Sequence, residues 1–176
     1  DPSVVRARLA DHPTIRGLAP RLTGVVALRS PQGEHYALLV GVDPALEKRL
    51  DLWGLQPEPE LTDGRCALSG ALASRLGVAS GDSVAAIQPS FGGETTWKVG
   101  ALLERQLLLP QEVREFVVVN AATARALLGE PGAVHVLAGA FREPASYYDS
   151  RDLYVSVRRL QAAGSDIAAR LGMDYD

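Results

Sequence analysis

The most regular hydrophobic pattern in the chain lies in residues 65–88, where the spacing of apolar side chains changes from two to four. Alternating apolar positions predict a strand over Arg65–Leu68. Leu72 and Leu76 then fall on one face of a short helix, because residues four apart lie above one another on a helix surface. Ser83–Gln88 again has the composition of a strand. The stretch therefore predicts a strand, a helix and a second strand.

The residues between these elements have the chemistry that the turns require. Ser69 is suited to cap the helix, since its hydroxyl can accept a hydrogen bond from a free amide of the first turn. Gly77 follows the last apolar position and can adopt the left-handed conformation that ends many helices. Gly81 and Asp82 form a second turn. These residues supply no nucleophile, base or metal ligand, so the stretch is predicted to be structural.

The first third of the chain alternates between helical and extended patterns. Asp1 and Pro2 are typical of a helix start, and His12-Pro13 is expected to end that helix. Thr23–Arg29 and His35–Val42 flank a polar turn and predict a hairpin. Asp43-Pro44 repeats the helix-start pattern and opens a short helix that runs to Leu50.

The last two thirds continue with the same mixture of helical and extended patterns. The expected elements are strands over Thr95–Leu103, Phe116–Val119 and Val134–Phe141, a helix over Ala121–Leu128 capped by Asn120 and closed by Gly129, and a last helix running to about Leu171. An acidic, proline-bearing stretch at Gln56–Glu60 predicts a subdomain boundary, and Leu107–Glu115 is expected to lead back to the first subdomain.

Composition narrows the range of functions. The chain has 176 residues, a net charge of −3 and one cysteine. The weak negative charge gives no reason to expect a nucleic-acid surface, and a single cysteine excludes an internal disulfide. Apolar runs such as Ala37–Val42 and Phe116–Val119 are too short to cross a bilayer, so any membrane segments would lie outside this sequence.

Several segments resemble one family. The run LSGALASRLGVASGDSVAAI at 68–87 is similar to the "lA..LGv..GD.v.l" segment of bacterial ABC-transporter permeases of the macrolide-exporter, lipoprotein-release and FtsX-like class (MacB/LolC/FtsX-like). The pair formed by Ala19–Arg21 and Val40–Leu50 resembles the family's "pR … v.GvdP..e" passage. TWKVGALLE at 96–104 and FVVVNAATARALLG at 116–129 follow in the family's order, so the resemblance covers nearly the whole chain.

The resemblance implies an extracytoplasmic, periplasmic-core domain of a membrane protein, placed between the first two transmembrane helices. It implies a mixed α+β domain in two lobes: a porter-like βαβ lobe from residues 1–56 and 116–176, and a small inserted β-rich lobe at 57–115. Such a domain is not an enzyme, because the ATPase is a separate cytoplasmic domain or subunit. The implied partners are a second copy or a related permease, the cytoplasmic ATPase, and an extracytoplasmic substrate or partner protein. No cofactor is implied.

Residues that could carry chemistry already have structural explanations. Cys66 lies in a buried-type strand, where a thiol behaves as a small hydrophobic group. His12, His35 and His135 are scattered and lack metal-ligand spacing. Asp43, Asp63 and Asp82 occupy turns or caps. The sequence therefore predicts no catalytic residue, no cofactor site and no metal site.

Two further patterns fail as chemical motifs. Gly92-Gly93 is not followed by the Gly-Lys-Ser/Thr of a phosphate-binding loop. Ser69 has alanines at 67 and 71 where a nucleophile elbow needs glycines. The one candidate binding feature is a polar loop with Tyr147 and Tyr148, since exposed aromatic residues are favoured at protein interfaces. We expect Trp97 to pack beneath a sheet.

A Gly-Asp turn between strands also occurs in double-psi and related barrels. An alternative function is therefore a free-standing double-psi-like ligand-binding or regulatory module. The permease interpretation predicts that Asp1–Arg8 and Ile167–Asp176 leave the same end of the domain. It also predicts that the isolated domain is a monomer or weak dimer, because membrane tethering replaces affinity.

Overall fold

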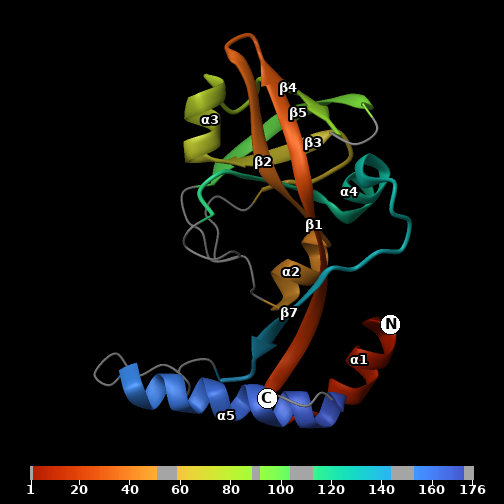
Figure 1. Ribbon diagram of the computed structural model, residues 1–176, viewed down its shortest axis with the longest axis vertical. Coiled ribbons are helices and arrows are strands. Elements are labelled where there is room, and N and C mark those ends of the chain that lie inside the picture. The colour runs from red at the N-terminus through yellow and green to blue at the C-terminus, as the bar shows by residue number, and fades with distance from the viewer. Residues whose placement is uncertain (1, 51–58, 89–91, 104–112, 144–152, 173–176) are drawn as a thin grey trace. The chain divides into compact units, whose positions relative to one another are not determined.

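The fold is that of a computed structural model, which describes residues 2–50, 59–88, 92–103, 113–143 and 153–172. The elements alternate along the chain (Figure 1). In order they are α1 Pro2–Leu9, β1 Ile15–Ser30, β2 Gly33–Val42, α2 Pro44–Leu50, β3 Arg65–Ser69, α3 Gly70–Leu76, β4 Ser83–Ile87, β5 Glu94–Leu103, β6 Phe116–Asn120, α4 Ala121–Leu128, β7 Val136–Phe141 and α5 Leu153–Leu171. The α+β class is confirmed.

Local capping chemistry sets the bounds of two helices as the sequence predicted. The Ser69 hydroxyl accepts a hydrogen bond from Leu72 N at the start of α3, and Gly77 ends that helix with a φ of 62°. The Asn120 side chain accepts from Thr123 N at the start of α4, and Gly129 closes it with a φ of 68°. Both glycines occupy a region that other residues enter only with strain.

The sheet closes on itself. Its strand order is β2-β6-β3-β5-β4-β1-β7, and β1 also pairs with β2, so six of the strands form a ring. The β2–β6 and β3–β5 pairs are parallel, and the other ring pairs are antiparallel. We therefore call this ring a barrel.

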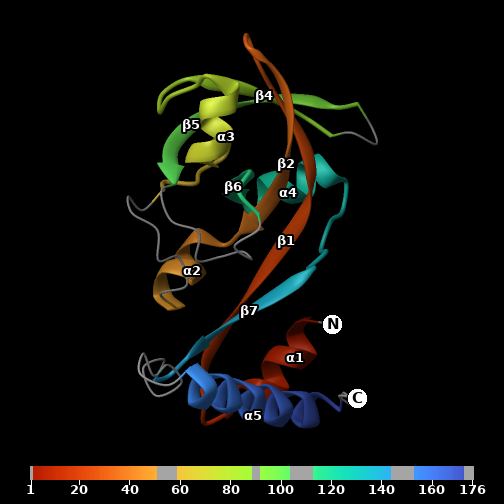
Figure 2. The same cartoon turned by 60° about the vertical axis from the view of Figure 1, so that its left-hand side comes forward.

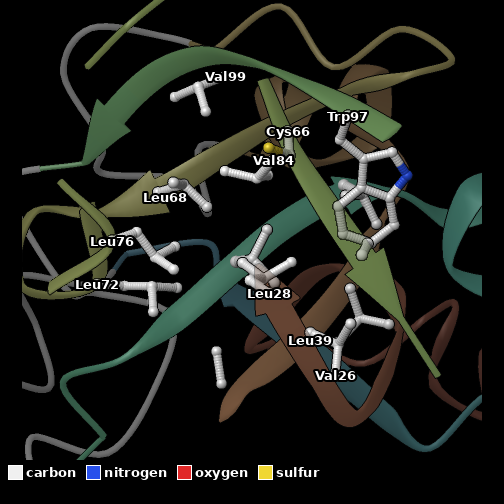
Figure 3. Packing of buried hydrophobic residues seen from close by; sticks show 14 of the residues in the cluster. Val26, Leu28, Leu39, Cys66, Leu68, Leu72, Leu76, Val84, Trp97 and Val99 are labelled. Atoms are coloured by element: carbon white, nitrogen blue, oxygen red, sulfur yellow. The ribbon is translucent and has the colours of Figure 1, made fainter. Parts of the chain in front are cut away.

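The barrel interior holds the main core. Figure 3 shows labelled side chains from β1, β2, β3, β4, β5 and α3 converging on one another. Trp97 is 1% exposed, and its ring lies in this core as predicted. The members labelled there are Val26, Leu28, Leu39, Cys66, Leu68, Leu72, Leu76, Val84, Trp97 and Val99. A second cluster on the outer face of β2, β3, β5 and β6 includes Val40, Leu103 and Phe116.

The chain divides into two compact units. Residues 19–137 form the barrel unit, and residues 1–18 with 138–176 form the end unit. This corrects the predicted boundaries at 57 and 115, because strands from 65–103 belong to the same sheet as β1 and β2: Ala27 pairs with Ile87, and Ala67 pairs with Val118. The predicted crossings at Gln56–Glu60 and Leu107–Glu115 lie largely outside the described residues.

The end unit contains the first and last helices, α1 and α5 (Figure 2). Arg8 Nη1 donates a hydrogen bond of 2.7 Å to the carbonyl of Leu171, which joins the last turn of α1 to the last turn of α5. Arg142 N donates to Thr14 O between the two chain segments. The first and last helices therefore contact each other.

The sequence pattern predicts that Pro20 divides the extended segment Thr14–Ser30, but the structure shows no division there. Ile15–Ser30 is one continuous strand. The pairing of β1 with β2 begins only at Leu22, so the missing N–H of Pro20 is not required for that ladder.

Candidate functional site

Cys66 is a core residue. It is fully buried, and burial raises the pKa of its thiol from 9.0 to about 12. A thiol must ionise to act as a nucleophile or to bind a metal, so this side chain remains protonated and inert at physiological pH. The interpretation of Cys66 as a small hydrophobic group agrees with this environment.

The three histidines lie in separate places, and His12 and His135 contact backbone groups. His12, in the end unit, is fully buried; its Nδ1 accepts from Thr14 N, and its Nε2 lies 2.9 Å from Oδ2 of Asp166, off the line of a hydrogen bond. His35 is half-buried on β2. His12 and His135 bind partners other than Cys66.

His135 differs from the expectation that it lies inside an apolar strand. It precedes β7 and contacts Thr23 through Nδ1 and Glu130 through Nε2, at 2.7 Å and 2.8 Å. Its backbone N–H also donates to Arg21 O. His135 therefore ties the start of β7 to β1, and a strand pattern alone does not reveal this role.

The carboxylates predicted to be structural have structural partners. Asp43 Oδ1 accepts from Leu46 N at the start of α2, and Asp82 Oδ2 accepts from Ala79 N. Asp63 Oδ1 accepts from the Asn120 side chain at 2.9 Å. The hydroxyl of Ser69, besides capping α3, accepts from Phe116 N. Each of these oxygens is engaged by a neighbouring donor.

The part of the chain that the structure describes contains no cluster of three or more His, Cys, Asp or Glu side chains that could hold a metal ion. No described helix is both long enough and apolar enough to cross a membrane. Tyr147 and Tyr148, the candidate partner-binding residues, lie outside the described residues, and their role remains a prediction.

A buried ion pair is the main feature that sequence reasoning missed. Arg21 Nε and Nη2 donate to the two carboxylate oxygens of Glu47 at 2.7 Å and 2.8 Å. The Glu47 side chain is fully buried, and that of Arg21 is 8% exposed. This forked geometry fixes β1 against α2. Both residues belong to the motifs that carry the family resemblance: Arg21 is the R of "pR", and Glu47 is the e of "GvdP..e". The motifs mark the two positions but do not show that the side chains pair.

The barrel unit also carries a groove of about 360 Å³ between the start of β5 and α4. Figure 1 shows α4 beside the first half of β5. The lining combines backbone at two glycines with apolar and hydroxyl side chains: Gly64, Gly93, Glu94, Thr95, Trp97, Thr123, Ala126 and Leu127. Glu94 is the one ionisable side chain among the described lining residues.

Comparison with solved structures identifies this arrangement. The extracellular domain of the noncanonic ABC-type transporter YknZ from Gram-positive bacteria matches with a TM-score of 0.54 at 11% identity, over 82% of this chain and 75% of that chain. The periplasmic region of MacB from Actinobacillus actinomycetemcomitans matches with a TM-score of 0.53 at 13% identity, over 95% and 74%.

A domain of a putative permease from Porphyromonas gingivalis matches with a TM-score of 0.52 at 15% identity, over 88% of this chain and 69% of that one. The chain has the fold of extracytoplasmic ABC-permease domains. The predicted resemblance is thus confirmed at the level of the fold. No protein-family model matches the sequence, and no curated protein matches it either.

Proposed function

We propose that this chain is a non-catalytic extracytoplasmic domain of an ABC-transporter permease. It couples ATP-driven movement of membrane helices to the engagement of a substrate or partner protein outside the membrane. The observation that carries the proposal is the likeness to three such domains over at least 82% of the chain. The inert environment of Cys66 and the structural roles of the carboxylates support a non-catalytic role.

The contact between the terminal helices supports the mechanical part of the proposal. Arg8 binds the carbonyl of Leu171, so a displacement applied to α1 is transmitted to α5 through a direct hydrogen bond and through the packing around it. Two helices that move together as one body provide the shear or hinge motion by which domains respond to their neighbours. The partners in this proposal are a second or related permease and the cytoplasmic ATPase.

The location can be tested by cysteine labelling in living cells. Cys66 is buried and un-ionised, so it provides a silent background. Ala122 is exposed on α4. The variant Ala122→Cys in the full gene product should react with a membrane-impermeant maleimide in intact cells, whereas the unsubstituted protein should not. Labelling of Ala122→Cys only after the cytoplasmic membrane is permeabilised would place the domain inside the cell and refute the proposal.

The closed barrel favours one alternative, the free-standing double-psi-like module. In this alternative the ring and its Gly81-Asp82 turn serve ligand binding without a membrane. The gene sequence on both sides distinguishes the two proposals, because a permease domain requires about 20 apolar residues before and after it. A self-contained gene without such segments would favour the module.

A further inference from the structure

The first half of β5 has a partner strand on only one side among the described residues. On one side, Glu94–Lys98 pairs with β4, from Glu94 opposite Ile87 to Lys98 opposite Ser83. On the other side, the pairing with β3 begins only at Lys98, which is opposite Arg65. Glu94, Thr95 and Thr96 are exposed. The β3-facing edge of residues 94–97 is therefore open in the described part of the barrel unit.

The hydrogen-bond pattern identifies which backbone groups face this open edge. Gln88 N donates to Gly93 O, and Val99 N donates to Asp82 O, so Gly93 and Val99 both point toward β4. Antiparallel ladders alternate in direction from one residue to the next. Glu94 and Thr96 therefore direct their N–H and C=O groups away from β4. The same alternation directs Lys98 N away from β4, and this group indeed donates to Gly64 O on the β3 side.

The described residues just before β3 do not extend along this edge. Arg65 N donates to Thr62 O, which closes a turn just before β3. Gly64 sits in that turn with a φ of 74°. This turn directs the described chain away from β5. The groove described above therefore occupies the position beside residues 94–97 that an N-terminal extension of β3 would take.

The groove has the shape and lining of a strand site. Ala126 and Leu127 of α4 form one wall, and Thr95 and Trp97 of β5 form the other. A Cβ atom built on Gly64 or Gly93 meets nothing within 4 Å, so the described backbone leaves space at these two lining positions.

We propose that an extended peptide segment of a partner protein binds here as an added β-strand, in line with β3. Its backbone would pair with Glu94 and Thr96, whose outward groups repeat at about 7 Å, the two-residue spacing of a strand. Its inward side chains would be apolar and contact Trp97 and Leu127. This is the main-chain recognition known as β-augmentation. The proposal rests on the geometry of the barrel unit and is independent of the proposed permease function.

The backbone pattern favours this occupant over two others. A small molecule does not need donors and acceptors repeated at strand spacing. A second copy of the chain would bring its own α4, which lies beside the same edge and would compete for the space. A single extended segment satisfies the outward backbone groups and fits between β5 and α4.

The test uses the 176-residue chain and a library of random linear twelve-residue peptides. Selected peptides would be synthesised with a fluorescent label and titrated by anisotropy. Thr96→Pro removes one outward N–H but no hydrogen bond to β4, whereas Thr96→Val keeps that N–H. Ala126→Trp fills the groove, and Ala122→Trp places the same side chain at an exposed position of α4 that does not line it.

We expect Thr96→Pro and Ala126→Trp each to raise the Kd at least tenfold, and the two matched controls to leave it within twofold. N-methylation along the peptide should weaken binding at alternate positions only. The proposal is wrong if no peptide is selected, or if selected peptides bind Thr96→Pro and Ala126→Trp as well as the wild type. It is also wrong if sedimentation shows self-association that Thr96→Pro abolishes, which would make a second copy the occupant.

Discussion

The barrel unit and the end unit are built from different kinds of core. The barrel unit buries large aliphatic and aromatic side chains inside a closed sheet, among them Trp97, Leu28 and Leu68. The apolar residues buried in the described part of the end unit are few and mostly small: Leu9, Ile15, Ala140, Ala163 and Ala168. Because burial energy scales with apolar area, the barrel unit has the larger internal stabilisation.

The same contrast appears in two pairs of polar side chains. Arg21–Glu47 in the barrel unit is buried and forked. His12–Asp166 in the end unit joins a buried ring to a carboxylate whose side chain is 55% exposed. A buried pair specifies one arrangement and makes loss of a partner costly, whereas an exposed partner can be replaced by water. The end unit is therefore the region more tolerant of change.

These two side-chain pairs give the largest expected difference in stability. Glu47→Ala leaves the Arg21 guanidinium buried without its carboxylate and should lower the free energy of unfolding by about 3–5 kcal/mol. Asp166→Ala should lower it by no more than about 1 kcal/mol. Urea unfolding followed by circular dichroism measures both. Equal losses for the two variants would remove the distinction between the units.

Truncation of buried side chains should give the second-largest difference in stability between the two units. Leu68→Ala removes a fully buried side chain from the barrel interior and should cost about 3–4 kcal/mol, because rigid surroundings retain the cavity. Leu9→Ala, among smaller neighbours in the end unit, should cost about 2 kcal/mol. The same urea series applies. A larger loss at Leu9 than at Leu68 would contradict the proposed difference in packing.

The third prediction concerns pH and Cys66. The pKa of this thiol is about 12 in the folded state and 9.0 when unperturbed. Its contribution to stability is complete below pH 9 and is lost between pH 9 and 12, since only the unfolded chain then releases the proton. Stability falls by about 1.4 kcal/mol per pH unit in that range. Between pH 8 and 10.5 the wild type should lose about 2 kcal/mol more than Cys66→Ala, and parallel pH profiles would disprove this.

The smallest expected effect concerns a helix cap. Asn120→Ala removes the acceptor for Thr123 N and the donor to Asp63, and should cost about 1 kcal/mol. Asn120→Asp keeps the capping oxygen but places a second carboxylate next to Asp63, so its stability should lie below the wild type. An Asp variant more stable than the wild type would show that the contact with Asp63 is unimportant.

Sequence reasoning succeeded where the chemistry is local. Ser69, Gly77, Asn120 and Gly129 were placed correctly because a cap depends on residues within one helical turn. It failed where the structure depends on distant pairs. The pairing of Ala27 with Ile87 closes the ring and overturns the predicted lobe boundaries, yet no periodicity encodes which strands become neighbours.

The candidate site shows the same limit. The absence of a reactive cysteine followed from the apolar surroundings of Cys66 in the sequence. The contact of Arg21 with Glu47 did not follow, since 26 residues separate them and each is an ordinary charged residue in its own segment. The open edge of β5 could not be predicted from the sequence either, because it depends on where β3 begins relative to β5.

The closed ring also has a consequence for biosynthesis. The β1–β2 hairpin is local and can form within about 1–10 μs. β2 pairs in parallel with β6, so the ring cannot close until Phe116–Asn120 has left the ribosome. Because synthesis adds about 5–20 residues per second, the β1–β2 hairpin has unpaired edges for several seconds. Such a nascent chain is exposed to misassembly throughout that interval, so chaperone binding before residue 116 should decide the yield of folded domain.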